Sequence, residues 1–132
     1  MELKANELRI GNLVQTNQGV FKVTKISQNE IDICPFLSNE PFSIFINTVK
    51  PIPLTDEWLL KFGFGKSDEH ELGHNLNNNF GFYYDYHFKR FRLETSDNDG
   101  LNYADVLLNI KHVHKLQNLF FALTGKELEI KM

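Results

Sequence analysis

Two prolines in one short segment, Pro51 and Pro53, constrain what this chain can fold into more than any other feature. Neither proline carries a backbone N–H, so a sheet that precedes them cannot continue through this segment. Residues 8–52 consist of short runs of alternating apolar and polar residues, separated by turn signals such as Asn17-Gln18-Gly19. The pattern predicts short antiparallel strands in a small β-barrel-like, SH3-like subdomain over residues 1–53.

A short helix is predicted directly after the prolines. Thr55 can cap its N-terminus, because a threonine hydroxyl accepts a hydrogen bond from a first-turn amide. Trp58, Leu59 and Phe62 follow at helical spacing, and Gly63 is a typical C-terminal stop. We expect Trp58 to pack this helix against the barrel-like half, although an exposed tryptophan can also anchor an interface.

From Phe80 the apolar residues alternate with polar ones, which is the period of a strand. One face of this strand would hold Phe80, Phe82, Tyr84, Tyr86 and Phe88. The alternation changes at Lys89-Arg90, which predicts a bulge or a turn there. Residues 97–100 are a hairpin signal, and residues 101–108 are expected to return as a strand.

The C-terminal region carries the clearest helical stripe, followed by Gly125 as a C-terminal stop. The stripe comprises Val113, Leu116, Leu119, Phe120 and Leu123. We expect this helix to cover the sheet of residues 80–108, and we expect His112 and His114 before it to be surface groups. The chain is therefore predicted to be α+β, with a helix, antiparallel strands and the C-terminal helix in residues 54–132, packed with the first half into one compact unit.

Composition narrows the classes of protein. The net charge of −3 provides no general basic field for nucleic acid. Cys34 is the single cysteine, which rules out an intramolecular disulfide and suits a reducing compartment. No apolar run reaches the roughly 18 residues of a membrane-spanning helix, and the first residues lack the apolar core of a secretory leader. We therefore predict a cytoplasmic protein without a membrane segment.

Residues 70–74 read His-Glu-Leu-Gly-His, the one string in this sequence that matches an enzyme motif. On a helix, His70 and His74 would hold a zinc ion, and Glu71 would act as general base for a metal-bound water. The flanks disfavour a helix, because glycines precede the string and asparagines follow it. No third histidine stands at the spacing of the metzincins. We predict a solvated loop and no metal or other cofactor, with a small zinc metallopeptidase as the alternative.

Aromatic and basic residues mix between positions 83 and 92. The strip comprises Tyr83, Tyr84, Tyr86, His87, Lys89, Arg90 and Arg92. Single-stranded RNA is commonly held by aromatic rings that stack on bases and by cations that meet phosphates. The same pattern also fits an ordinary amphipathic strand with a solvated charged face. If the strip binds a partner, we expect Tyr83, His87, Lys89, Arg90 and Arg92 to make the contacts.

Acidic residues gather around the predicted hairpin, with Asp97 and Asp99 in the turn and Glu94 and Asp105 beside it. Such a patch can mimic phosphate and engage a basic groove on a nuclease. The alternative is a solvated turn. Asp97 and Asp99 are therefore the second set of candidate binding residues.

Three segments of the chain resemble one family. They are Leu8-Arg9-Ile10-Gly11-Asn12, residues 51–64 (PIPLTDEWLLKFGF) and residues 112–128 (HVHKLQNLFFALTGKEL). In these segments the chain is similar to small, uncharacterised proteins of Bacteroidota phages, prophages and other mobile elements. The family has no established catalytic residues, so none carries over to this sequence.

The resemblance implies a function by context. Small accessory proteins of mobile elements often block host defence, and anti-CRISPR proteins against type VI-B effectors occur in this group of bacteria. The hypothesis is a non-enzymatic protein of the host cytoplasm that binds such an RNA-guided ribonuclease or its guide RNA. The alternatives are the zinc metallopeptidase and a regulatory single-stranded nucleic-acid-binding module.

Overall fold

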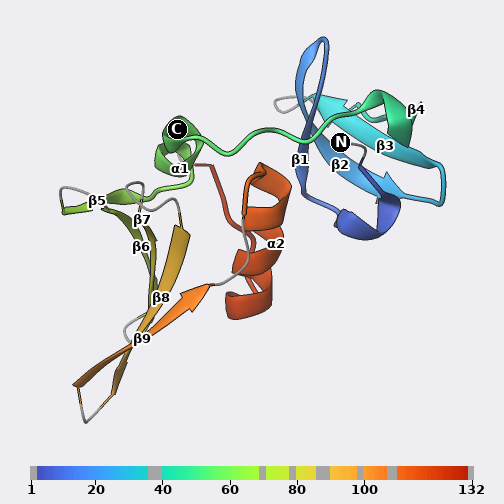
Figure 1. Ribbon diagram of the computed structural model, residues 1–132. Coiled ribbons are helices and arrows are strands. Elements are labelled where there is room, and N and C mark those ends of the chain that lie inside the picture. Colours follow the sequence, from blue (N-terminus) through green and yellow to red (C-terminus); the bar gives the residue numbers. More distant parts are fainter. Residues whose placement is uncertain are drawn as a thin grey trace. The chain divides into compact units, whose positions relative to one another are not determined.

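A computed structural model describes residues 3–35, 40–68, 71–77, 80–85, 90–97, 100–106 and 110–130. The chain is α+β, with a four-stranded and a five-stranded antiparallel sheet (Figure 1). It divides into two compact units. Unit 1 contains Met1–Leu54 and Lys111–Glu127, and unit 2 contains Thr55–Ile110 and Leu128–Met132.

The sheet of unit 1 has the order β1-β2-β3-β4. Its strands are β1 (Leu13–Thr16), β2 (Gly19–Ile26), β3 (Glu30–Pro35) and β4 (Phe42–Phe45). Short 3₁₀ helices, η1 (Ala5–Glu7) and η2 (Ile46–Thr48), precede β1 and follow β4. Thr16 pairs with Gly19, so the predicted hairpin at residues 17–19 is confirmed. The buried core includes Val14, Phe21, Val23, Ile31 and Ile33, which are the apolar members of the alternating runs.

One bridge joins the outer side of β1 to the segment after η2. The Gln15 N–H donates to the Lys50 carbonyl at 3.0 Å, and the Lys50 N–H donates to the Gln15 carbonyl at 2.8 Å. β4 stands at the other end of the strand order. The strands that the structure describes in this unit therefore form an open sheet and not a closed barrel.

Helix α2 (Val113–Thr124) confirms the predicted C-terminal helix. Gly125 ends it at a φ of 73°, a left-handed conformation that favours glycine, and its N–H donates to the Phe121 carbonyl at 2.7 Å. The sequence grouped this helix with residues 54–132, but the structure groups it with unit 1. An apolar stripe indicates which side of a helix is buried and not which sheet buries it, so the sequence could not decide between them.

Unit 2 begins with α1 (Asp56–Lys61), whose predicted cap is confirmed, because the Thr55 hydroxyl accepts a hydrogen bond from the Trp58 N–H at 3.3 Å. Gly63 follows at a φ of 91°. The five strands run in chain order as β5 (Gly65–Asp68), β6 (Glu71–Asn77), β7 (Phe80–Asp85), β8 (Arg90–Asp97) and β9 (Gly100–Val106). The buried core of this unit includes Leu59, Phe62, Phe64, Phe82 and Phe91.

The strand boundaries refine the predictions. β7 is described as far as Asp85, which pairs with Arg90 on β8, and the predicted continuation of the strand to Phe88 lies outside the described residues. Asp97 pairs with Gly100, in agreement with the predicted hairpin. Trp58 is half-buried and stacks near Phe62, at 5.8 Å between ring centroids, within its own unit. In the described part of the chain, no helix has both the length and the apolar content to cross a membrane.

Candidate binding surfaces

Residues 71–74 of the His-Glu-Leu-Gly-His string lie in a strand and not in the predicted loop. Glu71, Gly73 and His74 belong to β6, where neighbouring side chains point to opposite faces. The His74 ring lies against Phe64, with ring centroids 5.3 Å apart. Among the described residues no group of three or more His, Cys, Asp or Glu side chains is placed to hold a metal ion. His70 lies outside the described residues, and the helical spacing that the zinc hypothesis needs is absent from residues 71–74.

The predicted aromatic and basic strip is brought together in part. Tyr83 on β7 pairs with Arg92 on β8, and the Arg92 guanidinium lies over the Tyr83 ring at 5.0 Å from its centroid. Arg90 is exposed and stands opposite Asp85. Tyr86, His87 and Lys89 lie outside the described residues. The described residues of the strip thus include a cation–aromatic stack on this strand pair.

The opposite face of the same strands is core. Phe82 and Phe91 are buried and stack with ring centroids 5.0 Å apart, and the Tyr84 ring lies 4.8 Å from that of Phe91. Burial raises the pKa of the Tyr84 phenol, and the carboxylates of Asp56 and Asp85 raise it further. This tyrosine therefore stays protonated at neutral pH, as a structural side chain.

The strand register places acidic positions opposite basic positions of the strip. Asp85 lies directly opposite Arg90, and the backbone of Asp105 on β9 lies opposite Arg92. Cross-strand residues of opposite charge stabilise a sheet. Asp97 ends β8, and Asp99 lies outside the described residues. The register thus favours a mixed-charge surface over a strongly basic one.

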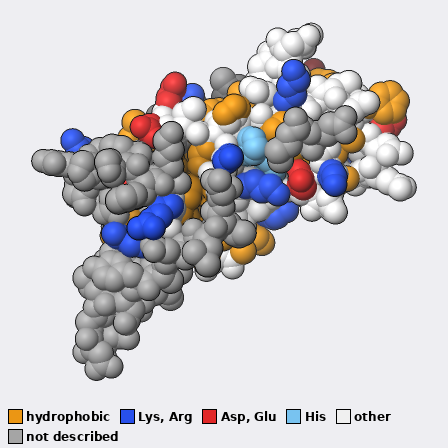
Figure 2. Space-filling view, in the orientation of Figure 1, with side chains coloured by type: hydrophobic (Ala, Val, Ile, Leu, Met, Phe, Trp, Pro, Cys, Tyr) orange, Lys and Arg blue, Asp and Glu red, His pale blue; other side chains and the backbone are white. Residues whose placement is uncertain are grey.

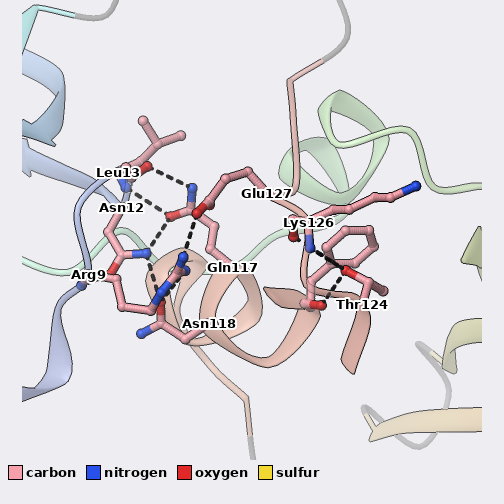
Figure 3. A network of polar contacts seen from close by, with 10 residues as sticks. Arg9, Asn12, Leu13, Gln117, Asn118, Thr124, Lys126 and Glu127 are labelled. Carbon is pink, nitrogen blue, oxygen red and sulfur yellow. Dashed lines mark hydrogen bonds and ion pairs between the residues drawn. The ribbon is translucent and has the colours of Figure 1, made fainter. Parts of the chain in front are cut away.

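A polar network in unit 1 was not predicted from the sequence (Figure 3). Asn12 Nδ2 donates to Asn118 Oδ1 at 2.8 Å, and Asn118 Nδ2 donates to the Glu7 carbonyl at 2.9 Å. Arg9 forms an ion pair with Glu127, and its guanidinium lies 3.8 Å from the centroid of the Phe121 ring. The network fastens the segment before β1 to helix α2.

Residues 8–12, 51–54 and 112–127, which are parts of the three segments singled out in the sequence, all lie in unit 1. The first segment contacts α2 through Arg9 and Asn12. The second contacts the start of the third through backbone hydrogen bonds, from the Val113 N–H to the Ile52 carbonyl at 2.9 Å and from the Leu54 N–H to the Lys111 carbonyl at 2.8 Å. These contacts give the three stretches a structural role within unit 1.

His114 is buried, with 0% of its side chain exposed, so the prediction of a surface group was wrong. The sequence places it one residue after Val113 at the start of α2, and the first turn of the helix faces the unit's interior. The described residues offer neither ring nitrogen a hydrogen bond, and the nearest carboxylate, Glu7 Oε2, is 4.0 Å from Nε2. Burial lowers the pKa of His114 to about 4, and the cations of Lys115 and His112 lower it while Glu7 opposes them.

A pocket of about 650 Å³ opens in unit 1 between the β1–β2 hairpin and β4. It is lined by Gln15, Thr16, Asn17, Gln18, Phe42, Ile44, Thr48 and Lys50. Its volume lies in the range of ~300–1,000 Å³ that is typical of ligand sites. No sequence pattern predicts it, because its walls come from two segments that only the fold of the sheet brings together.

No family model matches this chain, and neither the curated proteins nor the solved structures contain a match.

Proposed function

We propose that this protein acts by binding a protein partner and not by catalysis. The observation that carries the proposal is the exposed apolar surface of β4 beside the pocket. Phe45 is 60% exposed and Phe42 44% exposed, and both stand on a strand of only four residues. Large aromatic side chains at a surface are the usual anchors of protein interfaces. Figure 2 shows hydrophobic side chains that reach the surface among polar ones.

We further propose that unit 1 is an SH3-like module. The order β1-β2-β3-β4, the 3₁₀ helix η2 after β4, and the bridge from Lys50 back to Gln15 support this assignment. A small β module of this kind presents its ligand surface between strands and connecting loops. The pocket between the β1–β2 hairpin and β4 agrees with that arrangement.

The specific function proposed is inhibition of an RNA-guided ribonuclease of the type VI-B class, in the cytoplasm of a bacterial host. It is supported by the resemblance of the three segments to proteins of Bacteroidota mobile elements. The inhibitor would bind the effector protein or its guide RNA, and its small acidic chain is suited to contact with a basic nuclease surface.

The test is a cleavage assay with purified type VI-B effector, guide RNA and target RNA. The proposal predicts that a stoichiometric amount of this protein suppresses cleavage and co-elutes with the effector complex. Full cleavage together with separate elution would overturn the specific function. A parallel affinity purification from a Bacteroidota lysate, with mass spectrometry and RNA sequencing, then shows whether another partner is bound.

The alternative of a single-stranded nucleic-acid-binding module is favoured by the stack of Arg92 on Tyr83. That function predicts binding of RNA alone, with an affinity that falls steeply as salt rises. Arg92→Gln should then weaken RNA binding, whereas Lys22→Gln on β2 should not. If RNA alone does not bind at low salt, this alternative is excluded.

A further inference from the structure

The charged side chain that lines the pocket in unit 1 is positive. Among the described residues that line it, Lys50 is the one cation and none is an aspartate or glutamate. No carboxylate among the described residues forms an ion pair with Lys50. The rest of the wall combines the apolar side chains of Phe42 and Ile44 with the amides and hydroxyls of the hairpin. Such a site suits a ligand that carries one negative charge beside an apolar group.

The backbone beside the pocket can pair with an extended peptide. β4 stands at the end of the strand order, so its outer side is not paired with a strand in the described part of the chain. Phe42 and Ile44 are two residues apart on that strand, and both line the pocket. An added strand would therefore place alternate side chains against the same wall.

A peptide fits these features better than a nucleic acid does. Polynucleotide binding draws most of its affinity from several phosphate contacts, and each contact needs a cation. The described wall of the pocket contains one lysine, and the whole chain has a net charge of −3. One lysine is sufficient for one carboxylate, and the unpaired strand edge provides the remaining hydrogen bonds.

We propose that the pocket between β4 and the β1–β2 hairpin binds an extended segment of a partner protein, whose apolar side chain contacts Phe42 and Ile44 and whose aspartate or glutamate pairs with Lys50. The inference rests on the proposed function of protein binding and specifies the chemistry of the segment that is bound.

The experiment uses an array of strand-forming peptides in which valine alternates with threonine and one position carries glutamate, glutamine or lysine. The full-length protein is compared with Lys50→Gln and Phe42→Ala. Lys22→Gln is the matched control for charge, because Lys22 is exposed on β2 and does not line the pocket. Leu60→Ala is the matched control for exposed apolar surface, because Leu60 is exposed on α1 of unit 2 and does not line the pocket.

The expected result is preferential binding of glutamate peptides, with a loss of about tenfold in affinity for Lys50→Gln, as one charged hydrogen bond predicts. Phe42→Ala should lose binding at unchanged or slightly lower melting temperature, and both controls should bind as wild type. Because Phe42 also contacts Phe21, at 5.8 Å between ring centroids, the melting temperature of each variant is measured beside the binding.

Equal binding of glutamate, glutamine and lysine peptides, or equal binding by Lys50→Gln, would overturn the inference. Binding of an oligouridylate that Lys50→Gln abolishes would also overturn it, in favour of a nucleotide site. Recovery of the same partner by wild type, Lys50→Gln and Phe42→Ala would overturn the inference and leave the proposed function intact. If no peptide binds and no partner is recovered, both the inference and the proposed function would be overturned.

Discussion

The side-chain amide of Gln117 on α2 hydrogen-bonds to the backbone at the start of β1, as a neighbouring strand would. Its Oε1 accepts a hydrogen bond from the Leu13 N–H at 2.8 Å, and its Nε2 donates to the Gly11 carbonyl at 3.2 Å. The side chain is buried, with 3% exposed. One amide therefore satisfies a donor and an acceptor of the backbone that would otherwise be left unpaired where water has little access.

We predict that Gln117→Leu destabilises the protein by about 2–4 kcal/mol, because the substitution leaves both backbone groups unpaired in a buried site. Urea unfolding measures the free energy of unfolding. The matched control is Gln28→Leu, which replaces an exposed glutamine in the β2–β3 turn and should change stability by less than about 0.5 kcal/mol. Equal stability of Gln117→Leu and wild type would show that water or another group replaces the amide.

The buried His114 predicts a pH-dependent stability. Its pKa in the folded state is about 4, whereas an unfolded histidine has a pKa of about 6.5. Between these values the unfolded state binds the proton more tightly, so the free energy of unfolding falls as the pH drops from about 6.5 to 4 and is unaffected by this group above pH 7. The loss attributed to His114 is on the order of 3 kcal/mol.

The groups near His114 are Glu7, Lys115 and His112, and their charges modify this dependence. The measurement is the difference in unfolding free energy between wild type and His114→Phe across this pH range. The difference should grow in favour of the variant as the pH falls. Parallel curves would mean that His114 does not carry the pH dependence.

Arg9 and Phe121 provide a test of the contact between the N-terminal segment and α2. The Arg9 guanidinium lies over the Phe121 ring and also pairs with Glu127. This geometry predicts a coupling energy of about 0.5–1 kcal/mol between Arg9 and Phe121. A double-mutant cycle with Arg9→Met and Phe121→Leu measures it. Additive effects of the two substitutions would show that the stack does not contribute to stability.

The strand geometry of residues 71–74 predicts that the protein binds no stoichiometric zinc. The purified protein should contain far less than one equivalent by elemental analysis, and Glu71→Gln should leave its melting temperature nearly unchanged. One equivalent of zinc that His74→Ala removes would contradict the strand assignment and restore the metallopeptidase hypothesis.

The sequence predicted most local elements, because caps, turns and periodicity depend on neighbouring residues. Thr55, Gly63 and Gly125 ended or began helices as predicted. It failed where distant segments meet. The buried side of α2 was readable in part, because Val113, Leu116 and Phe120 of the predicted stripe are buried whereas Leu123 is 43% exposed. The polar partners Asn12 and Gln117, which lie far apart in the sequence, show that the helix belongs with unit 1.

The candidate sites divide in the same way. The pairing of Tyr83 with Arg92 follows from strand alternation and a turn, so the sequence contained it in outline. The pocket has no such signal, because its lysine and its aromatic wall come from positions 42 and 50 and its polar wall from positions 15–18. The sequence contains a zinc-binding motif, but that motif binds zinc only on a helix. Residues 71–74 form a strand.

Hydrogen exchange of the protein, alone and in complex with a type VI-B effector ribonucleoprotein, tests the central claim most directly. The account predicts that complex formation slows exchange in β4 and around Lys50, at the pocket edge, while β7 and β8 exchange at their free rates. Protection confined to β7 and β8, or no change in β4 on formation of a stable complex, would contradict binding through the pocket of unit 1.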